Sequence, residues 1–183
     1  MPLSALDRRM LGWSALFVVS QANIARLLGP TAPNVLAVQT AWSEQRYRQI
    51  LASMDETDIA RFRSHYPPDF VHPAIYAVAL RAGARSLAAK TPLSPAVTTA
   101  LALAPVASAA GDYIENIVGL ILVDNRERIT DTVVRATTVV STVKWVLALG
   151  TLTYLSQGFL RVWGRALLGR GSSTSNVDLD LYR

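Results

Sequence analysis

The sequence predicts an all-α integral membrane protein, a bundle of four spanning helices with an interfacial helical segment between the first two spans. Of its 183 residues, 51% are hydrophobic and only 17% are charged, against about 25% charged in soluble domains. The mean hydropathy is +0.27, and several long runs carry no charge. We expect a single domain over residues 1–168, followed by a polar tail at 169–183.

The composition excludes several classes of protein. Because the chain has no cysteine, it has no disulfide framework, zinc finger, iron–sulfur site or thiolate nucleophile. The net charge of +5 comes from 16 arginines and 2 lysines, which are not interleaved with aromatic residues as single-strand binding requires. We therefore expect no nucleic-acid partner, and we place this charge at lipid headgroups.

The first span is predicted over about residues 11–28, close to the roughly 20 residues that cross a bilayer. Gly29 and Pro30 then end it. Arg8 and Arg9 precede the apolar run as in a signal peptide, but no small-residue cleavage site follows. We expect a retained anchor.

Two short amphipathic helices are predicted over about residues 43–64, outside the membrane or at its surface. Ser43 and Asp55 are the expected N-caps of the two helices. The second helix is expected to end by Tyr66, because two prolines follow and disfavour helical geometry before them.

Three further spans are predicted over about residues 68–89, 97–123 and 132–159. The apolar core of the second is short, with Pro73 inside it and two arginines at its end, whose stems can reach the headgroups. An even number of spans places both termini on one side. The excess of basic residues there favours the cytoplasmic or matrix side.

Ionisable residues near the centres of the last two spans form the main candidate site. Asp112, Glu115 and Asn116 share one helical face because they stand three and four residues apart. A central acid costs about 2.5–3.5 kcal/mol on insertion scales, so this face needs a partner inside the protein. Lys144 lies near the centre of the next span, and antiparallel packing predicts that it pairs with Asp112 or Glu115.

Four interpretations of these charges remain open. They form a structural ion pair that fixes helix register, or a proton or ion path or acid/base site. The three-residue spacing of Asp69 and His72, and of Asp112 and Glu115, is also superficially similar to di-iron bundles. Such sites need two histidines among their ligands, and the chain has only His72 and His65, the latter expected in a loop. Haem binding by the same pair is the fourth interpretation, and we predict no metal.

A second polar cluster, Asp69, His72 and Tyr76, shares a face of the second span. The simplest interpretation is a capping aspartate and a hydrogen-bonded histidine at a kinked helix start. No Ser–His–Asp arrangement and no glycine-rich phosphate loop can be assembled from the sequence. We therefore predict no catalytic residue.

Five basic residues are expected to converge at one membrane face, where the second span, the following connection and the end of the fourth span meet. They are Arg81, Arg85, Lys90, Arg161 and Arg165. A di-anionic lipid such as cardiolipin would satisfy their charges at about 1 kcal/mol per cation. The alternative is that they reach bulk anionic lipid.

Several motifs resemble a family of uncharacterised small four-span membrane proteins of bacteria and fungi. They include Trp42-Ser43-Glu44, Asp69-Phe70, Asp112-Tyr113-Ile114-Glu115-Asn116 and Lys144-Trp145. The resemblance covers about residues 10–158 and implies a four-span architecture with a shared polar cluster, but no activity. Met54-Asp55 replaces the tryptophan-glycine usual in that family.

The favoured function is that of a non-catalytic accessory subunit of an energy-transducing membrane complex, either a respiratory complex or an ATP synthase. Its partners would be other membrane subunits and bound anionic lipid, in the mitochondrial inner membrane or, alternatively, a bacterial inner membrane. Aromatic residues beside the spans and an apolar-acidic segment at 177–182 are expected to contact neighbours. The alternative is a small membrane enzyme or proton-linked transporter that uses Asp112, Glu115 and Lys144.

Overall fold

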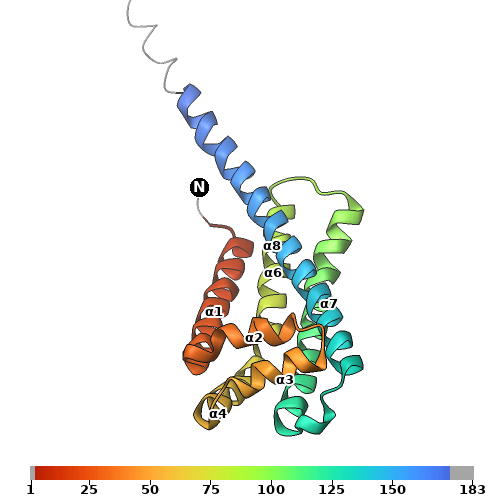
Figure 1. The fold of residues 1–183 in the computed structure, drawn as a ribbon. Helices are drawn as coiled ribbons and strands as arrows, with labels where there is room; N and C mark the ends of the chain where they lie inside the picture. Colours follow the sequence, from red (N-terminus) through yellow and green to blue (C-terminus); the bar gives the residue numbers. More distant parts are fainter. Residues whose placement is uncertain (1–2, 174–183) are drawn as a thin grey trace, which may run out of the picture.

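The computed structural model describes residues 3–173, which form ten helical segments and no strand. Figure 1 shows their arrangement. In chain order they are α1 (Ala5–Leu28), η1 (Gly29–Thr31), α2 (Ala32–Gln39), α3 (Glu44–Ala52), α4 (Glu56–Ser64), α5 (Tyr66–Asp69), α6 (His72–Ala88), α7 (Pro95–Asp124), η2 (Arg126–Arg128) and α8 (Asp131–Ser173). The all-α class predicted from the sequence is confirmed.

Three helical segments are long and apolar enough to cross a membrane: Ala5–Gln39, Pro95–Asp124 and Asp131–Arg165. They contain the first, third and fourth spans predicted from the sequence. These three helices are compatible with an integral membrane protein.

The second predicted span, residues 68–89, is not among these three segments. Its helix, α6, has only 17 residues, which is about 25 Å of helix against about 30 Å of hydrocarbon. As predicted, the preceding helix α4 ends before Tyr66, at Ser64, and the two prolines then lie in the separate short helix α5, which was not predicted. Proline suits a first helical turn because its missing N–H needs no partner there.

Helix α1 begins six residues before the predicted span. Ser4 caps it: Ser4 Oγ accepts a hydrogen bond from the Asp7 N–H, and the Asp7 carboxylate accepts one from the Ser4 backbone N–H, which forms a capping box. The helix ends at Leu28 as predicted, because Gly29 adopts a φ of 49°, in the left-handed region that favours glycine. The chain then enters α2, which the sequence analysis did not predict and which runs across the ends of the long helices (Figure 1).

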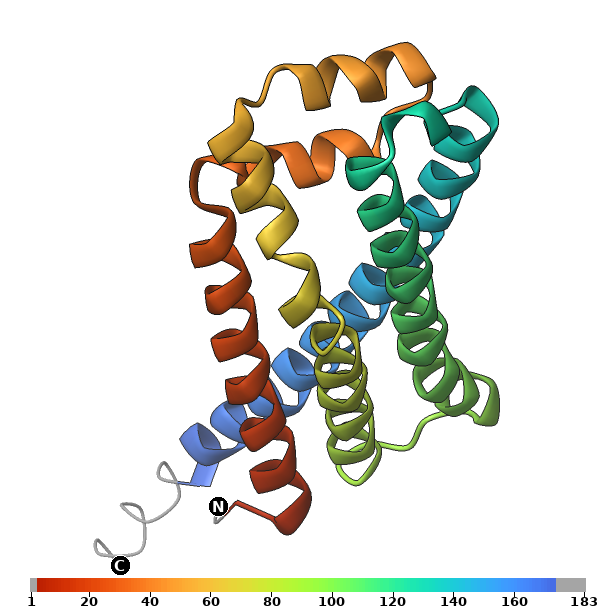
Figure 2. The same cartoon turned by 90° about the horizontal axis from the view of Figure 1, so that it is seen from below.

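The long helices pack closely around α6. Figure 2 shows α6 between α1 and α7, with α8 crossing behind them. Glycines permit the close contacts: a Cβ at Gly158 of α8 would lie 2.5 Å from Leu87 of α6. A Cβ at Gly111 of α7 would lie 3.0 Å from the Cβ of Lys144 on α8.

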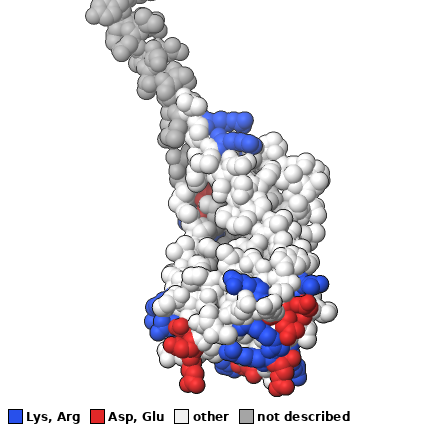
Figure 3. All heavy atoms as spheres, viewed as in Figure 1, with Lys and Arg blue, Asp and Glu red and all other residues white. Residues whose placement is uncertain are grey.

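Helices α3 and α4 form a cap over one end of the long helices. Their predicted N-caps are present: Ser43 Oγ accepts a hydrogen bond from the Arg46 N–H and Asp55 Oδ1 from the Asp58 N–H. The cap packs on the long helices through fully buried apolar side chains such as Phe62. Figure 3 shows charged residues concentrated at this end, a smaller basic group at the opposite end and a largely uncharged surface between them.

Helix α8 continues through Ser173, past residue 159, where the fourth span was predicted to end, and into the predicted tail. The start of α1 and the end of α8 lie at the same end of the molecule (Figure 2). The segment at 177–182 that was predicted to dock on a partner lies outside the described residues.

Candidate functional site

Lys144 of α8 lies between two carboxylates of α7. Its Nζ is 2.9 Å from Glu115 Oε2 and also contacts Asp112 Oδ1. Lys144 is only 5% exposed. The structure thus brings together the three ionisable residues that helical spacing placed opposite one another.

Small residues on α7 allow this approach. Gly111 has no side chain to separate the two helices, and Ser108 donates a hydrogen bond of 2.9 Å to the Lys144 carbonyl. Both positions lie one turn or less before Asp112 on the same face of the helix. The run of small residues before the acids therefore determines how closely Lys144 approaches them.

The second oxygen of Asp112 is held by α6. Tyr76 Oη donates a hydrogen bond of 2.5 Å to Asp112 Oδ2, and the same hydroxyl lies 2.9 Å from Ser108 Oγ. Tyr76 was predicted in a separate cluster with Asp69 and His72. The structure instead joins Tyr76 to the main cluster.

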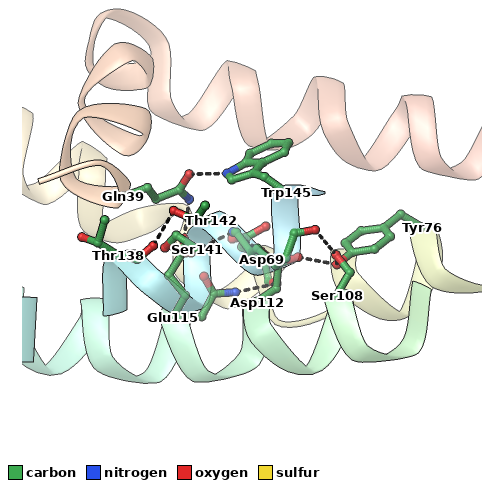
Figure 4. Close-up of polar contacts among 12 residues, drawn as sticks. Gln39, Asp69, Tyr76, Ser108, Asp112, Glu115, Thr138, Ser141, Thr142 and Trp145 are labelled. Atoms are coloured by element: carbon green, nitrogen blue, oxygen red, sulfur yellow. Dashed lines mark hydrogen bonds and ion pairs between the residues drawn. The ribbon is translucent and has the colours of Figure 1, made fainter. Parts of the chain in front are cut away.

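Glu115 is held by α8 and α2. Ser141 Oγ donates to Glu115 Oε2 at 2.5 Å, and Gln39 Nε2 donates to the other oxygen. Trp145 Nε1 donates to Gln39 Oε1 at 3.0 Å. In Figure 4, Gln39, Glu115 and Trp145 lie side by side within one hydrogen-bonded network.

The remaining predicted members have other contacts. Asn116 Nδ2 donates to the backbone carbonyl of Asp69 at 2.9 Å, so it ties α7 to α5 and does not contact Lys144. His72 Nδ1 lies 3.0 Å from Ser20 Oγ of α1. Asp69, His72 and Tyr76 thus take part in three different polar contacts, although the His72 and Tyr76 rings still lie edge to face with their centroids 5.8 Å apart.

Gln39 is the principal site residue that the sequence analysis missed. It lies 76 positions from Glu115, at the end of a helix that was expected to be a connection. A usable signal was present, since Gln39 and Thr40 end the apolar run Val35–Val38, which a soluble connection does not need. Thr138 of α8 similarly donates to the Ala41 carbonyl and fixes the chain that follows α2.

A small cavity of about 30 Å³, lined by both polar and apolar side chains, adjoins Glu115. It is enclosed by α2, α3, α5, α7, α8 and the end of α4. Its walls are Val35, Val38, Gln39, Tyr47, Phe62, His65, Tyr66, Asp69, Glu115, Asn116, Gly119 and Thr137. Burial lowers the pKa of His65, while burial and the negative charge of Glu115 raise the pKa of Tyr47.

The acidic residues and the two histidines of the described chain lie in separate contacts. Within residues 3–173, no three His, Asp or Glu side chains are grouped so as to hold a metal ion. The two histidines are separately engaged, because His65 Nδ1 bonds to the Phe62 carbonyl and His72 Nδ1 to Ser20. The Ser20–His72 contact is a pair that sequence reasoning did not assemble, but no carboxylate of the described chain hydrogen-bonds to His72.

One of the five predicted lipid-binding residues is already paired. Lys90 Nζ lies 2.6 Å from Asp7 Oδ1, and Ser86 Oγ also donates to this oxygen at 2.6 Å. Asp7 was not considered as a partner because it lies 83 positions away, in a capping box. Arg81, Arg85, Arg161 and Arg165 have no ion-pair partner among residues 3–173.

Comparisons of the chain with protein-family models, curated proteins and solved structures find no match.

Proposed function

We propose that the protein is a non-catalytic integral membrane subunit that binds another membrane protein through the outer face of α8. In this proposal α6 is a fourth crossing that completes a four-helix bundle, and α3 and α4 lie at the membrane surface. The packing of α6 against both α1 and α7 supports the fourth crossing.

The observation that carries the proposal is a shallow groove of about 680 Å³ on the outer face of α8. Its polar members have nothing to gain from lipid, because hydrocarbon offers no hydrogen-bond partner. Trp145 and Tyr154 are 41% and 40% exposed there. The groove is formed by Thr40, Thr142, Trp145, Val146, Leu149, Gly150, Thr153, Tyr154 and Gln157.

The chemistry of this groove suits a transmembrane helix. A Cβ placed on Gly150 would meet nothing within 4 Å, so a neighbouring backbone can approach closely. Thr153 and Gln157 have no side-chain hydrogen bond within the described part of the chain. Hydroxyl and amide groups of this kind bond across helix interfaces in membranes.

The inner network supports a structural role for the charges. Every fully buried side-chain nitrogen and oxygen of the described residues has a hydrogen-bond partner. A satisfied network of this kind fixes helix register, whereas a partly satisfied one destabilises the fold. In this proposal, the buried cluster holds α8 in the orientation that exposes its outer face.

The identity of the complex is a further part of the proposal. We propose an energy-transducing assembly in the mitochondrial inner membrane, with a bacterial inner membrane as the alternative, and anionic lipid at the four free arginines. The likeness to small four-span proteins of bacteria and fungi belongs to the same proposal. Copurification from native membranes with a stoichiometric partner would identify the process.

A matched pair of glycine variants tests the interface. Gly150→Phe fills the groove, whereas Gly12→Phe adds the same side chain at an exposed position of α1 where a Cβ also meets nothing within 4 Å. We expect both variants to insert, and only Gly150→Phe to leave the native complex on a blue-native gel. If both variants, or neither, leave the complex, the outer face of α8 is not the interface.

A further inference from the structure

The acids around Lys144 outnumber the bases. Asp69, Asp112 and Glu115 lie close enough to interact electrostatically with one another and with Lys144. If all four groups were ionised, two negative charges would remain uncompensated. Burying uncompensated charge is costly, and the usual response is uptake of a proton.

Asp69 is the carboxyl group that we expect to take up this proton. Lys144 contacts Asp112 and Glu115, whereas no cationic side chain within residues 3–173 forms an ion pair with Asp69. The other titratable groups that face the cluster and its cavity are Tyr47, His65, Tyr66, His72 and Tyr76. None of them supplies a strong cation.

The cavity offers this carboxyl group a route to water. Asp69 and Glu115 both line the cavity, and its volume of about 30 Å³ exceeds the roughly 10–15 Å³ that one water molecule needs. The hydroxyls of Tyr47 and Tyr66 also face it, and they have no hydrogen-bond partner in the described chain although these residues are 3% and 4% exposed. Since every fully buried side-chain oxygen of the described residues has a partner, these two hydroxyl oxygens are accessible to a water-sized probe, and water in the cavity can hydrogen-bond to them.

We propose that Asp69 holds an exchangeable proton, and that water in this cavity carries the proton between Asp69, Glu115 and the end of the molecule covered by α3 and α4. The transfer breaks the O–H bond of the Asp69 carboxyl group and forms one on a water oxygen, without any redox change. Helices α3 and α4 supply Tyr47 and Phe62 to the cavity wall, so the path starts directly beneath the charged cap.

Infrared spectroscopy of the full chain in lipid nanodiscs tests the proton. Exposed carboxyl groups are ionised at pH 7, so a protonated carboxyl band at this pH reports a buried acid. We expect one such band, which disappears in Asp69→Asn and persists in Asp112→Asn. A wild-type spectrum without the band overturns the proposal, as does a band that survives Asp69→Asn.

Transfer into heavy water tests the path. The band of the wild-type protein should shift at once, because cavity water exchanges the proton. Gly119→Ala should slow the shift at least about tenfold, the effect of losing one hydrogen bond, since its Cβ would lie 2.5 Å from Tyr66 Oη. Gly12→Ala, on an open face of α1, is the matched control and should exchange like the wild type.

Tyr66→Phe provides the same test without added bulk. It removes only a hydroxyl that has no protein partner, so we expect a folded protein with slowed exchange. If both Gly119→Ala and Tyr66→Phe exchange as fast as the wild type, the cavity is not the path. If sodium chloride removes the band at constant pH, a cation and not a proton occupies the site, and the proposal is wrong.

Discussion

Lys144 Nζ and Glu115 Oε2 lie 2.9 Å apart at the contact between α8 and α7. Lys144 also bonds to Asp112, and Glu115 also accepts hydrogen bonds from Gln39 and Ser141. This one relationship therefore connects three helices, α2, α7 and α8. In the proposed function, this contact fixes the register of α8 against α7.

Lys144→Met should strongly destabilise the protein. Removing one partner of a buried ion pair leaves uncompensated charge and typically costs about 3–5 kcal/mol. Unfolding in bicelles with increasing denaturing detergent measures the loss. The double variant Lys144→Met/Asp112→Asn should recover part of it, and strictly additive losses would show that the two residues are not coupled.

The stability of the cap should depend on pH through His65. Burial lowers the pKa of this histidine below its ordinary value of 6.5, so the unfolded chain binds the proton more readily. The contribution of His65 to the free energy of unfolding is therefore fully present above pH 6.5, and it is lost as the pH falls from 6.5 through the lowered pKa. We expect the melting temperature to fall less steeply below pH 6.5 in His65→Gln. Identical slopes in both proteins would contradict this prediction.

The crossing of α6 can be tested by labelling, because the native chain has no cysteine. Single cysteines can replace Glu56, at the start of α4 before α6, and Ala89, directly after α6, and both positions are exposed. If α6 crosses the membrane, a membrane-impermeant reagent should label them from opposite sides of sealed vesicles. Labelling of both from one side would leave three crossings.

The retention of anionic lipid should depend on the four arginines and not on Lys90. Replacing Arg81, Arg85, Arg161 and Arg165 by glutamine should remove retained cardiolipin in native mass spectrometry, at about 1 kcal/mol per cation. Lys90→Gln should instead lower stability, because it removes the cation that pairs with Asp7 and leaves Ser86 as its remaining partner on that oxygen. Equal lipid retention by the quadruple variant and the wild type would indicate contact with bulk lipid only.

The sequence was informative where one helix carries its own pattern. The spacing of Asp112 and Glu115 and the central position of Lys144 predicted their contact, because antiparallel neighbours align their midpoints. Capping residues predicted the starts of α3 and α4 for a similarly local reason.

Long-range contacts could not be predicted in this way. Gln39 and Tyr76 reach the cluster from α2 and α6, and nothing in their local sequence specifies the partner. The pair of Asp7 and Lys90 depends on how α1 and α6 pack. The prolines follow the ends of α1 and α4 as expected, but the short helices α2 and α5, whose first turns contain Pro33 and Pro67, were not predicted.

The most direct test of the proposed membrane subunit is photo-crosslinking in native membranes. A photoreactive residue at Val146, which is 65% exposed in the α8 groove, should form one discrete protein adduct. The same residue at Ile117 of α7, 51% exposed and outside the groove, should react only with lipid. The account predicts that Gly150→Phe abolishes the adduct at Val146. Lipid adducts alone at both positions, with the chain migrating as a monomer, would contradict it.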